Sequence, residues 1–331
     1  MLTRRLLPAL AATLLPGLAQ AQALPGRRRT QDPDVTMPEP SRRAWADQVP
    51  VIRYGIMGGE NEADRLGRFE GYRALIERTF GVPTRLFPAS DYAGVMQGLS
   101  AKQLELAALG PSGYAGAWMD TDGGIEPLTI TQQGDGSISY VSVLVVRADS
   151  GITSLEQMRG RSLAWADPNS TSGYLIPRFQ LRRLGIGVES GQYFGRTGFA
   201  GGHEQGVVAV LQRQYDGAVT HASTLGDPAQ GYSRGNLRAM VDKGMLRMSD
   251  VRIVWTSEPI MNGPLAVRTD LPADFKRDMQ TFQLALVKSH PDIARQIARG
   301  DTIGAVEARH EDYALFVDMR REEAAARRRR S

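Results

Sequence analysis

The stretch of this sequence best suited to chemistry is Asp167 to Tyr174, which reads DPNSTSGY. An apolar segment ends where it begins and a helical pattern follows, so Ser170, Thr171 and Ser172 stand at a predicted helix start. The N–H groups of a first helical turn are unpaired and lie at the positive end of the helix dipole, so such a turn favours an anion. The alternative is ordinary capping by Asn169 or Ser170. Capping needs one hydroxyl, whereas three precede a glycine here.

A histidine stands at a second predicted helix start, in the segment Ala200 to Glu204 (AGGHE). His203 could donate a hydrogen bond to an anion, and a cationic imidazole would bind the anion more strongly. The alternative is a histidine that only caps the loop. Glu204 follows directly, but no second histidine stands at helical spacing, which excludes the HExxH zinc motif.

Two tyrosines occupy positions from which a hydroxyl could reach a cleft. Tyr92 lies in the first turn of a predicted helix that Ser90 or Asp91 would cap, and Tyr140 begins a long apolar strand, SYVSVLVVR. For each tyrosine, packing in the core or at the surface is the alternative interpretation. Neither residue identifies a site by itself.

Strands and helices alternate around these residues, a pattern typical of a mainly parallel sheet flanked by helices. The pattern occurs in two blocks, so we predict an α/β protein with two lobes. Predicted strands cover residues 51–56, 84–87, 104–109, 139–147, 160–166, 216–220, 251–256 and 264–268. Predicted helices cover residues 62–80, 92–99, 175–184, 204–215 and 275–289.

Four segments, DYAGVMQGL, SYVSVLVVR, DPNSTSGYLIP and GGHEQGVVAV, occur in this order and at these intervals. Together they resemble the substrate-binding proteins of phosphonate ABC transporters, over about residues 51–290. The resemblance implies a type II (Venus-flytrap) periplasmic binding protein in which each lobe is a sheet flanked by helices. Two crossing strands, expected near residues 142–147 and 251–257, would form the hinge.

The same resemblance implies a phosphonate, phosphite or phosphate bound between the lobes. The implied ligand-binding residues are Tyr92, Tyr140, Ser170, Thr171, Ser172 and His203, with Ser112, Glu204 and Ser223 in a possible second tier. Members that bind aminoethylphosphonate hold its ammonium with acidic groups, at positions that correspond here to Ser223 and Gly263. Because neither is acidic, we expect this ligand to be disfavoured, unless Glu204, Asp227 or Glu258 supplies the carboxylate.

The composition narrows the class of protein and its compartment. The chain has 331 residues with no cysteine and four histidines, which argues against thiolate chemistry, disulfides and a multi-histidine metal site. Arg4 and Arg5, an apolar run and Ala19-Gln20-Ala21 predict a signal peptide over residues 1–21, with Sec and twin-arginine export both open. We therefore expect a protein of the periplasm.

Composition and the two blocks of alternating strands and helices divide the rest of the chain into an arm, two lobes and a tail. We expect a flexible arm (22–48), lobe 1 (49–144 plus 256–319), lobe 2 (145–255) and a basic C-terminal tail (320–331). The two ends carry charges of +3 and +4, which leaves −3 for the remainder, so the basic character does not indicate nucleic-acid binding.

These features predict a monomeric capture protein that docks on a membrane permease and uses no metal or cofactor. An enzyme is disfavoured because the sequence has no GxSxG elbow, no SxxK–KTG set and no metal-ligand cluster. Two alternatives remain open: a binding protein for another small anion, such as a sulfonate or carboxylate, and a ligand-sensing partner of a membrane receptor kinase.

Overall fold

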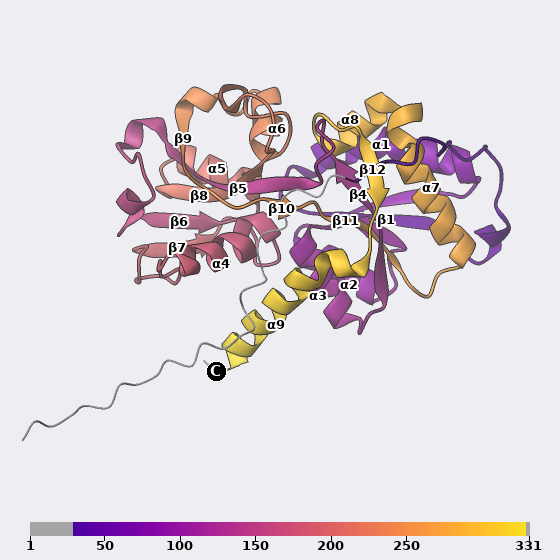
Figure 1. The fold of residues 1–331 in the computed structure, drawn as a ribbon, viewed down its shortest axis with the longest axis horizontal. Coiled ribbons are helices and arrows are strands. Elements are labelled where there is room, and N and C mark those ends of the chain that lie inside the picture. Colours follow the sequence, from indigo (N-terminus) through magenta and orange to yellow (C-terminus); the bar gives the residue numbers. More distant parts are fainter. Residues whose placement is uncertain (1–28, 329–331) are drawn as a thin grey trace, which may run out of the picture.

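Alternating strands and helices form two separate sheets with helices on both faces of each, as Figure 1 shows. The structure is a computed structural model that describes residues 29–328. The expected signal peptide (1–21), the first part of the expected arm and the last three residues lie outside that range. The predicted α/β class with two lobes is confirmed.

The first sheet has the strand order β12-β4-β11-β3-β1-β2, with β1 parallel to β2 and β3 and the remaining pairs antiparallel. One face packs on α1, α7 and α8 and the other on α2, α3 and α9. Its strands are β1 (Ile52–Ile56), β2 (Thr84–Pro88), β3 (Leu106–Ala108), β4 (Ile125–Gln132), β11 (Pro264–Arg268) and β12 (Gly304–Glu307). Its helices are α1 (Glu62–Phe80), α2 (Tyr92–Ser100), α3 (Pro111–Asp120), α7 (Ala273–Ser289), α8 (Pro291–Ala298) and α9 (Ala314–Arg328).

The second sheet has the strand order β10-β5-β8-β6-β7, and β9 pairs with the same edge of β5 as β10 does. Its strands are β5 (Ser139–Arg147), β6 (Ser162–Trp165), β7 (Arg196–Phe199), β8 (Gly217–Ala222), β9 (Val251–Thr256) and β10 (Ile260–Met261). Its helices are α4 (Ile176–Arg183), α5 (His203–Leu211) and α6 (Asn236–Asp242).

Local signals in the sequence explain why the longest helix of the first lobe starts and stops where predicted. The side chain of Asn61 accepts a hydrogen bond from the Asp64 N–H at 3.3 Å and caps α1. Gly81 ends the helix with φ of 65°, in the left-handed region that favours glycine. Between these residues, Phe69, Tyr72 and other apolar side chains at helical spacing are buried.

The chain crosses between the lobes at other places than expected. All of β5 pairs in the second sheet, from Val141 opposite Ala222 onward, so the crossings are residues 133–138 and 262–263. They lie side by side, since the Asn262 N–H donates to the Ile138 carbonyl at 2.7 Å. The expected boundaries between residues 144 and 145 and between residues 255 and 256 therefore both fall inside strands of the second sheet, β5 and β9. The apolar run of β5 does not show in the sequence which of the two sheets it joins.

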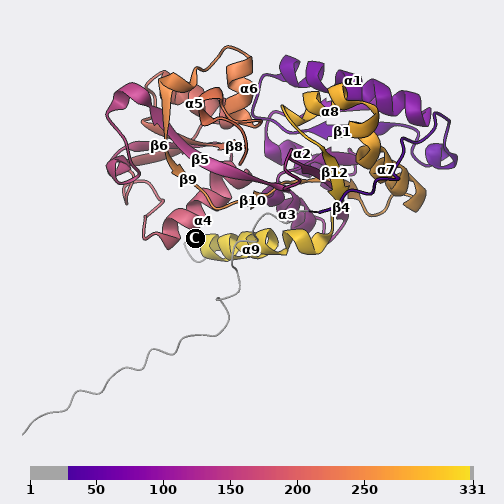
Figure 2. The same cartoon turned by 45° about the horizontal axis from the view of Figure 1, so that its top comes forward.

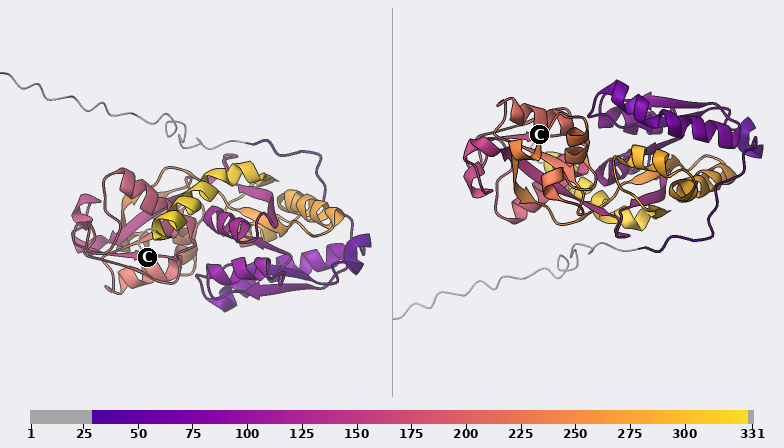
Figure 3. Two further views of the ribbon diagram at one scale, coloured as in Figure 1. Left: turned by 90° about the horizontal axis from the view of Figure 1, so that it is seen from below. Right: turned by 90° about the horizontal axis from the view of Figure 1, so that it is seen from above.

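Residues 29–48 pack along the outer side of the first lobe instead of forming a free arm (Figure 3). Trp45 is buried, its ring meets Phe275 edge-on at 4.9 Å, and its Nε1 donates to Asp278 at 2.7 Å. Arg29 donates to the Glu307 carbonyl at 2.6 Å. This segment, although rich in proline and arginine, thus contains one buried aromatic residue, Trp45, that holds it on the lobe.

The expected tail also differs, because residues 320–328 continue helix α9. In Figures 1 and 2 this helix starts on the first lobe and ends beside α4 of the second. Arg320 donates to the Asn169 side chain at 2.7 Å, and Glu323 lies 3.5 Å from Arg178. The helix thus touches both lobes. Within residues 29–328, no helix combines the length and apolar character needed to cross a bilayer.

The crossing at Gly263 gives a test of this packing. A Cβ atom there would lie 1.8 Å from the Leu109 carbonyl oxygen, so the backbone would have to move. We expect Gly263→Ala to lower the free energy of unfolding by about 1–3 kcal/mol in urea denaturation. Gly67→Ala is the control, because nothing lies within 4 Å of its Cβ position and alanine is the better helix former. Equal stability of the two variants would contradict the crossing as described.

Candidate functional site

A cavity of about 250 Å³ lies between the two lobes, and all six residues expected to bind ligand line it. On the first lobe it is formed by the start of α2, the β3–α3 turn, β4 and the end of α8. On the second lobe it is formed by β5, the start of the helical segment before α4, the start of α5, β8 and the segment before α6, and the crossing at residues 262–263 completes it. The lining residues are Met57, Tyr92, Gly110, Thr131, Tyr140, Ser170, Thr171, Ser172, His203, His221, Ala222, Ser223, Arg234, Gly235, Asn262, Gly263, Ala298 and Arg299.

The three consecutive hydroxyls sit at a helix start, as predicted. Ser170 is the cap, since its Oγ accepts a hydrogen bond from the Gly173 N–H at 3.0 Å. The turn from Thr171 to Leu175 is wider than an α-helix and leads into α4. Gly173 permits the tight fit, because a Cβ there would come within 2.4 Å of Ala166 and 2.9 Å of His203. Capping thus accounts for Ser170, and Thr171 and Ser172 remain on the cavity wall.

His203 is the first residue of α5 and faces the same turn, with its Nε2 3.0 Å from the Ser170 Oγ. Its ring meets His221 of β8 edge-on at 4.6 Å. Burial lowers the pKa of His203 well below its ordinary value, and burial followed by the charge of Arg234 lowers the pKa of His221 to about 4. Both rings are therefore neutral at pH 7, so the binding strength expected of a cationic imidazole does not apply.

The two tyrosines reach the cavity from opposite lobes. Tyr92 is the first residue of α2, which Asp91 caps by accepting from the Gly94 N–H at 2.8 Å. Tyr140 lies at the start of β5, and its ring meets His221 edge-on at 6.0 Å. Burial raises the pKa of Tyr92 above its ordinary value and that of Tyr140 to about 12, so both hydroxyls keep their protons and can donate.

The second-tier residues have three different positions. Ser223 lines the cavity, but its hydroxyl donates to Gln133. Ser112 is buried behind the wall, where its N–H donates to the Thr171 Oγ1 at 2.8 Å across the two lobes. Glu204 does not line the cavity, and its carboxylate accepts from Lys243 at 2.9 Å where the two lobes meet.

The other two carboxylates considered for an ammonium also lie elsewhere. Asp227 caps a short turn by accepting from the Ala229 N–H at 2.9 Å, and Glu258 is exposed. Neither residue lines the cavity. The described lining therefore contains no acidic residue.

Sequence reasoning missed several polar residues of this lining. His221, Arg234, Asn262, Thr131 and Arg299 come from strands, turns and crossings far apart in the chain. His221 alone carried a usable signal, as one of only four histidines, next to the Ser223 position already considered. Arg234 and Arg299 are two among forty basic residues, and only the fold singles them out.

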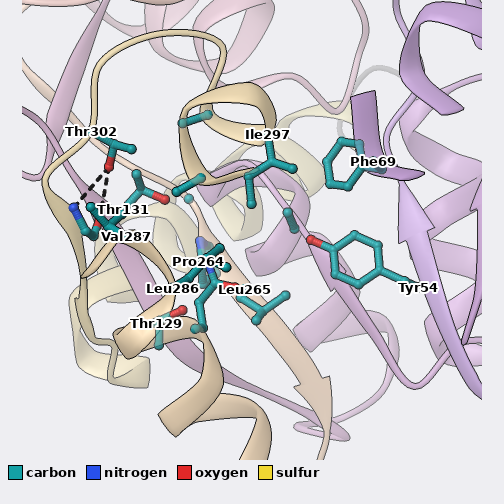
Figure 4. Close-up of a pocket in the computed structure, with 16 residues that line it drawn as sticks. Tyr54, Phe69, Thr129, Thr131, Pro264, Leu265, Leu286, Val287, Ile297 and Thr302 are labelled. Carbon is teal, nitrogen blue, oxygen red and sulfur yellow. Dashed lines mark hydrogen bonds between the residues drawn. The ribbon is translucent and has the colours of Figure 1, made fainter. Parts of the chain in front are cut away.

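A second cavity, of about 100 Å³, adjoins the first inside the first lobe. Figure 4 shows Phe69, Leu286 and Ile297 among its apolar walls and the Tyr54 hydroxyl directed toward its interior. No charged side chain lines it. Of these two cavities, the interlobe cavity is the one suited to an anion. In the described part of the chain, no group of three or more histidine, aspartate or glutamate side chains could hold a metal ion.

With this geometry in place, comparison with known families identifies the chain. A profile of the periplasmic substrate-binding proteins of phosphonate ABC transporters matches residues 54–313. The chain belongs to this family. The match spans both lobes and includes every residue of the cavity lining.

Relatives of this phosphonate-transporter binding protein agree with the assignment. The phosphate-import protein PhnD of Mycolicibacterium smegmatis is 29% identical over 250 residues, which are 72% of this chain and 73% of that protein. The phosphonates-binding periplasmic protein of Escherichia coli is 27% identical over 240 residues, which are 71% of this chain and 66% of that protein. Both are named as binding or import proteins.

Solved structures agree on the fold. PhnD1 of Prochlorococcus marinus, in complex with methylphosphonate, has a TM-score of 0.69 at 18% identity, with 83% of this chain and 98% of that chain covered. A binding protein of a phosphonate ABC transporter from Pseudomonas aeruginosa has a TM-score of 0.64 at 22% identity, with coverage of 85% and 97%. These likenesses confirm the predicted two-lobe architecture.

The neutral histidines lead to a prediction on pH. The unfolded chain protonates His221 near pH 6.5, whereas the folded chain does so near pH 4, so stability is lost as pH falls between these values. From pH 7 to pH 5 we expect His221 alone to account for a loss of about 2 kcal/mol.

Urea denaturation of the wild type and of His221→Gln at both pH values measures this loss. Between pH 7 and pH 5, the free energy of unfolding of the variant should fall by about 2 kcal/mol less than that of the wild type. His203 still lowers the stability of both proteins in the same direction. Only differences between the two pH values are compared, so any packing defect of the variant cancels. An identical pH dependence in both proteins would contradict the burial of His221.

Proposed function

We propose that this protein captures a phosphorus oxyanion, a phosphonate, phosphite or phosphate, in the interlobe cavity and delivers it to the permease of an ABC importer. Family membership supports transport. The observation that carries the ligand class is the turn of Ser170, Thr171 and Ser172 beside His203, facing Tyr92 and Tyr140 in a cavity without acidic lining residues. These groups bind an anion and perform no reaction on it. The protein acts in the periplasm, as a monomer, after export through its signal peptide.

The donors of this cavity suit a tetrahedral anion. The N–H groups of the Thr171 turn and of the start of α5 point their positive ends at the site, and hydroxyls from both lobes surround it. Bonds to an ionised acceptor are stronger than neutral ones. About six of them can supply the roughly 8 to 12 kcal/mol of a micromolar to nanomolar site after desolvation.

Closure of the lobes is part of the same mechanism. The Thr171 Oγ1 accepts from the Ser112 N–H, and Lys243 of the second lobe pairs with Asp64 of the first at 2.7 Å. The Asp301 N–H donates to the Ser233 carbonyl at 3.3 Å. The two lobes are thus joined on several sides of the cavity. The anion enters an open form, and closure follows when donors from both lobes reach it.

Substitution of Thr171 tests the site. Thr171→Val keeps the shape but removes the hydroxyl that faces the cavity and accepts the interlobe bond from Ser112, so we expect about 10- to 100-fold weaker binding of methylphosphonate. The control is Thr256→Val, at an exposed position of β9. Isothermal titration measures both proteins. Wild-type affinity in Thr171→Val would place the ligand elsewhere.

A ligand screen tests the function itself. The thermal stability of residues 22–331 is measured with phosphate, phosphite, methylphosphonate, aminoethylphosphonate, sulfate and taurine. A ligand at 100 times its Kd adds about 2.7 kcal/mol and raises Tm. We expect the rise with a phosphorus oxyanion other than aminoethylphosphonate, whose ammonium would find no carboxylate in the lining. A rise only with sulfate or taurine favours the sulfonate alternative, and no rise at all rejects the anion site.

A further inference from the structure

One cation in the interlobe cavity has no anionic partner. Arg234 follows β8 and lies just before α6, and its side chain lines the cavity. Its Nη2 donates to the Asn262 Oδ1 at 3.0 Å. Its Nη1 is buried and has no hydrogen-bond partner among residues 29–328. A guanidinium with an unused, buried N–H group is costly unless something else accepts from it.

The surroundings of Arg234 do not neutralise its charge. The groups that face it are the amide of Asn262, the neutral ring of His221 and the protonated hydroxyl of Tyr140. Burial lowers the pKa of Arg234 to about 10, so it remains a cation at pH 7. The positive charge of Arg234 is therefore not balanced by any acidic residue of the described cavity lining.

The other arginine of the lining differs in this respect. Arg299 lies against the Glu60 carboxylate, which also accepts two hydrogen bonds from Arg68 at 2.9 Å each. Lys243 is 3.7 Å from the same carboxylate. Arg299 thus belongs to a network of ion pairs at the edge of the cavity, whereas Arg234 has only an amide.

Arg234 makes no hydrogen bond to the hydroxyl turn in the described structure, although Tyr140 faces both. Ser170 contacts His203, the His203 ring meets His221 on β8, and Ser223 follows directly after that strand. The Ser223 N–H then donates to the Arg234 carbonyl at 3.1 Å. The hydroxyl turn and Arg234 thus occupy different parts of the cavity wall, with Arg234 beside Asn262 and Ser223.

The size of the cavity leaves room for a ligand that reaches both the hydroxyl turn and Arg234. It encloses about 250 Å³, several times the roughly 30 Å³ share of one water molecule in the liquid. A bare oxyanion would leave much of this space to water. An acceptor beside Asn262 would meet the side chain of Arg234, which lines the cavity there.

We propose that the ligand of this protein carries a second anionic group, a carboxylate separated from the phosphonate by a short carbon chain, and that Arg234 binds that carboxylate. The assignment rests on the proposed function. The planar guanidinium suits a planar carboxylate acceptor, and the Asn262 side chain orients it. The preferred substrate class is then the phosphonocarboxylates, of which phosphonoacetate is the simplest probe.

Isothermal titration with a matched ligand pair tests the assignment. Phosphonoacetate and phosphonoacetamide have nearly the same shape and differ in the charge of one group. We expect the wild type to bind the carboxylate about 10- to 100-fold more tightly than the amide. In Arg234→Met the ratio of the two affinities should fall toward one, and Arg234→Lys, which keeps the charge, should retain part of it. Arg247→Met removes an exposed arginine and should keep the wild-type ratio.

The outcomes separate this proposal from the function on which it rests. A wild type that does not prefer the carboxylate, or an Arg234→Met variant that keeps the preference, overturns the role of Arg234. Equal losses for phosphonoacetate and methylphosphonate in Arg234→Met also overturn it, because the arginine would then bind the phosphonate group. Thermal melting shows which variants fold. If Arg234→Met does not fold, the ratio of the affinities for phosphonoacetate and phosphonoacetamide in Arg234→Lys decides between the outcomes. Failure of every phosphorus ligand to bind the wild type rejects the proposed function itself.

Discussion

The interlobe cavity concentrates hydrogen-bond donors and positive charge where protein acceptors are scarce. The hydroxyl turn, two tyrosines and an arginine face it, and no described lining residue is acidic. Buried donors without acceptors cost free energy, so the closed arrangement is incomplete without an anion. Under the proposed function, selectivity for an anion and closure upon binding would have this one cause. The rest of the fold would then serve to keep these donors in place while the lobes open and close.

The architecture places donors from both lobes around one point. The helical turn at Thr171 and the helices α2 and α5 each begin at the cavity, so their unpaired N–H groups and dipoles converge there. Glycines allow the two lobes to approach closely. A Cβ atom on Gly202 would lie only 2.5 Å from the Cα atom of Gly59 in the other lobe. Open α/β sheets commonly bind ligands beyond the ends of their strands, and two such sheets facing each other enclose the ligand.

Part of this could be predicted from the sequence. Helix α1, the cap at Ser170 and the histidine at the start of α5 follow from local rules of periodicity and capping. The crossings could not be placed, because the apolar sequence of β5 does not show which of the two sheets it joins. Arg234 and Asn262 were missed for a related reason. Nothing in their own neighbourhoods distinguishes them, and only tertiary contacts between distant segments bring them to the cavity.

Helix α9 has a mechanical consequence. It is anchored on α3 of the first lobe, yet it meets the second lobe through Arg320 with Asn169 and through Glu323 with Arg178. Asn169 directly precedes the hydroxyl turn, so separating the lobes must strain or break contacts made by this helix. The far end of α9 therefore changes its distance from α4 whenever the site opens. A pair of fluorophores on these two helices would convert each capture event into an optical signal, which makes the protein a ready scaffold for a biosensor.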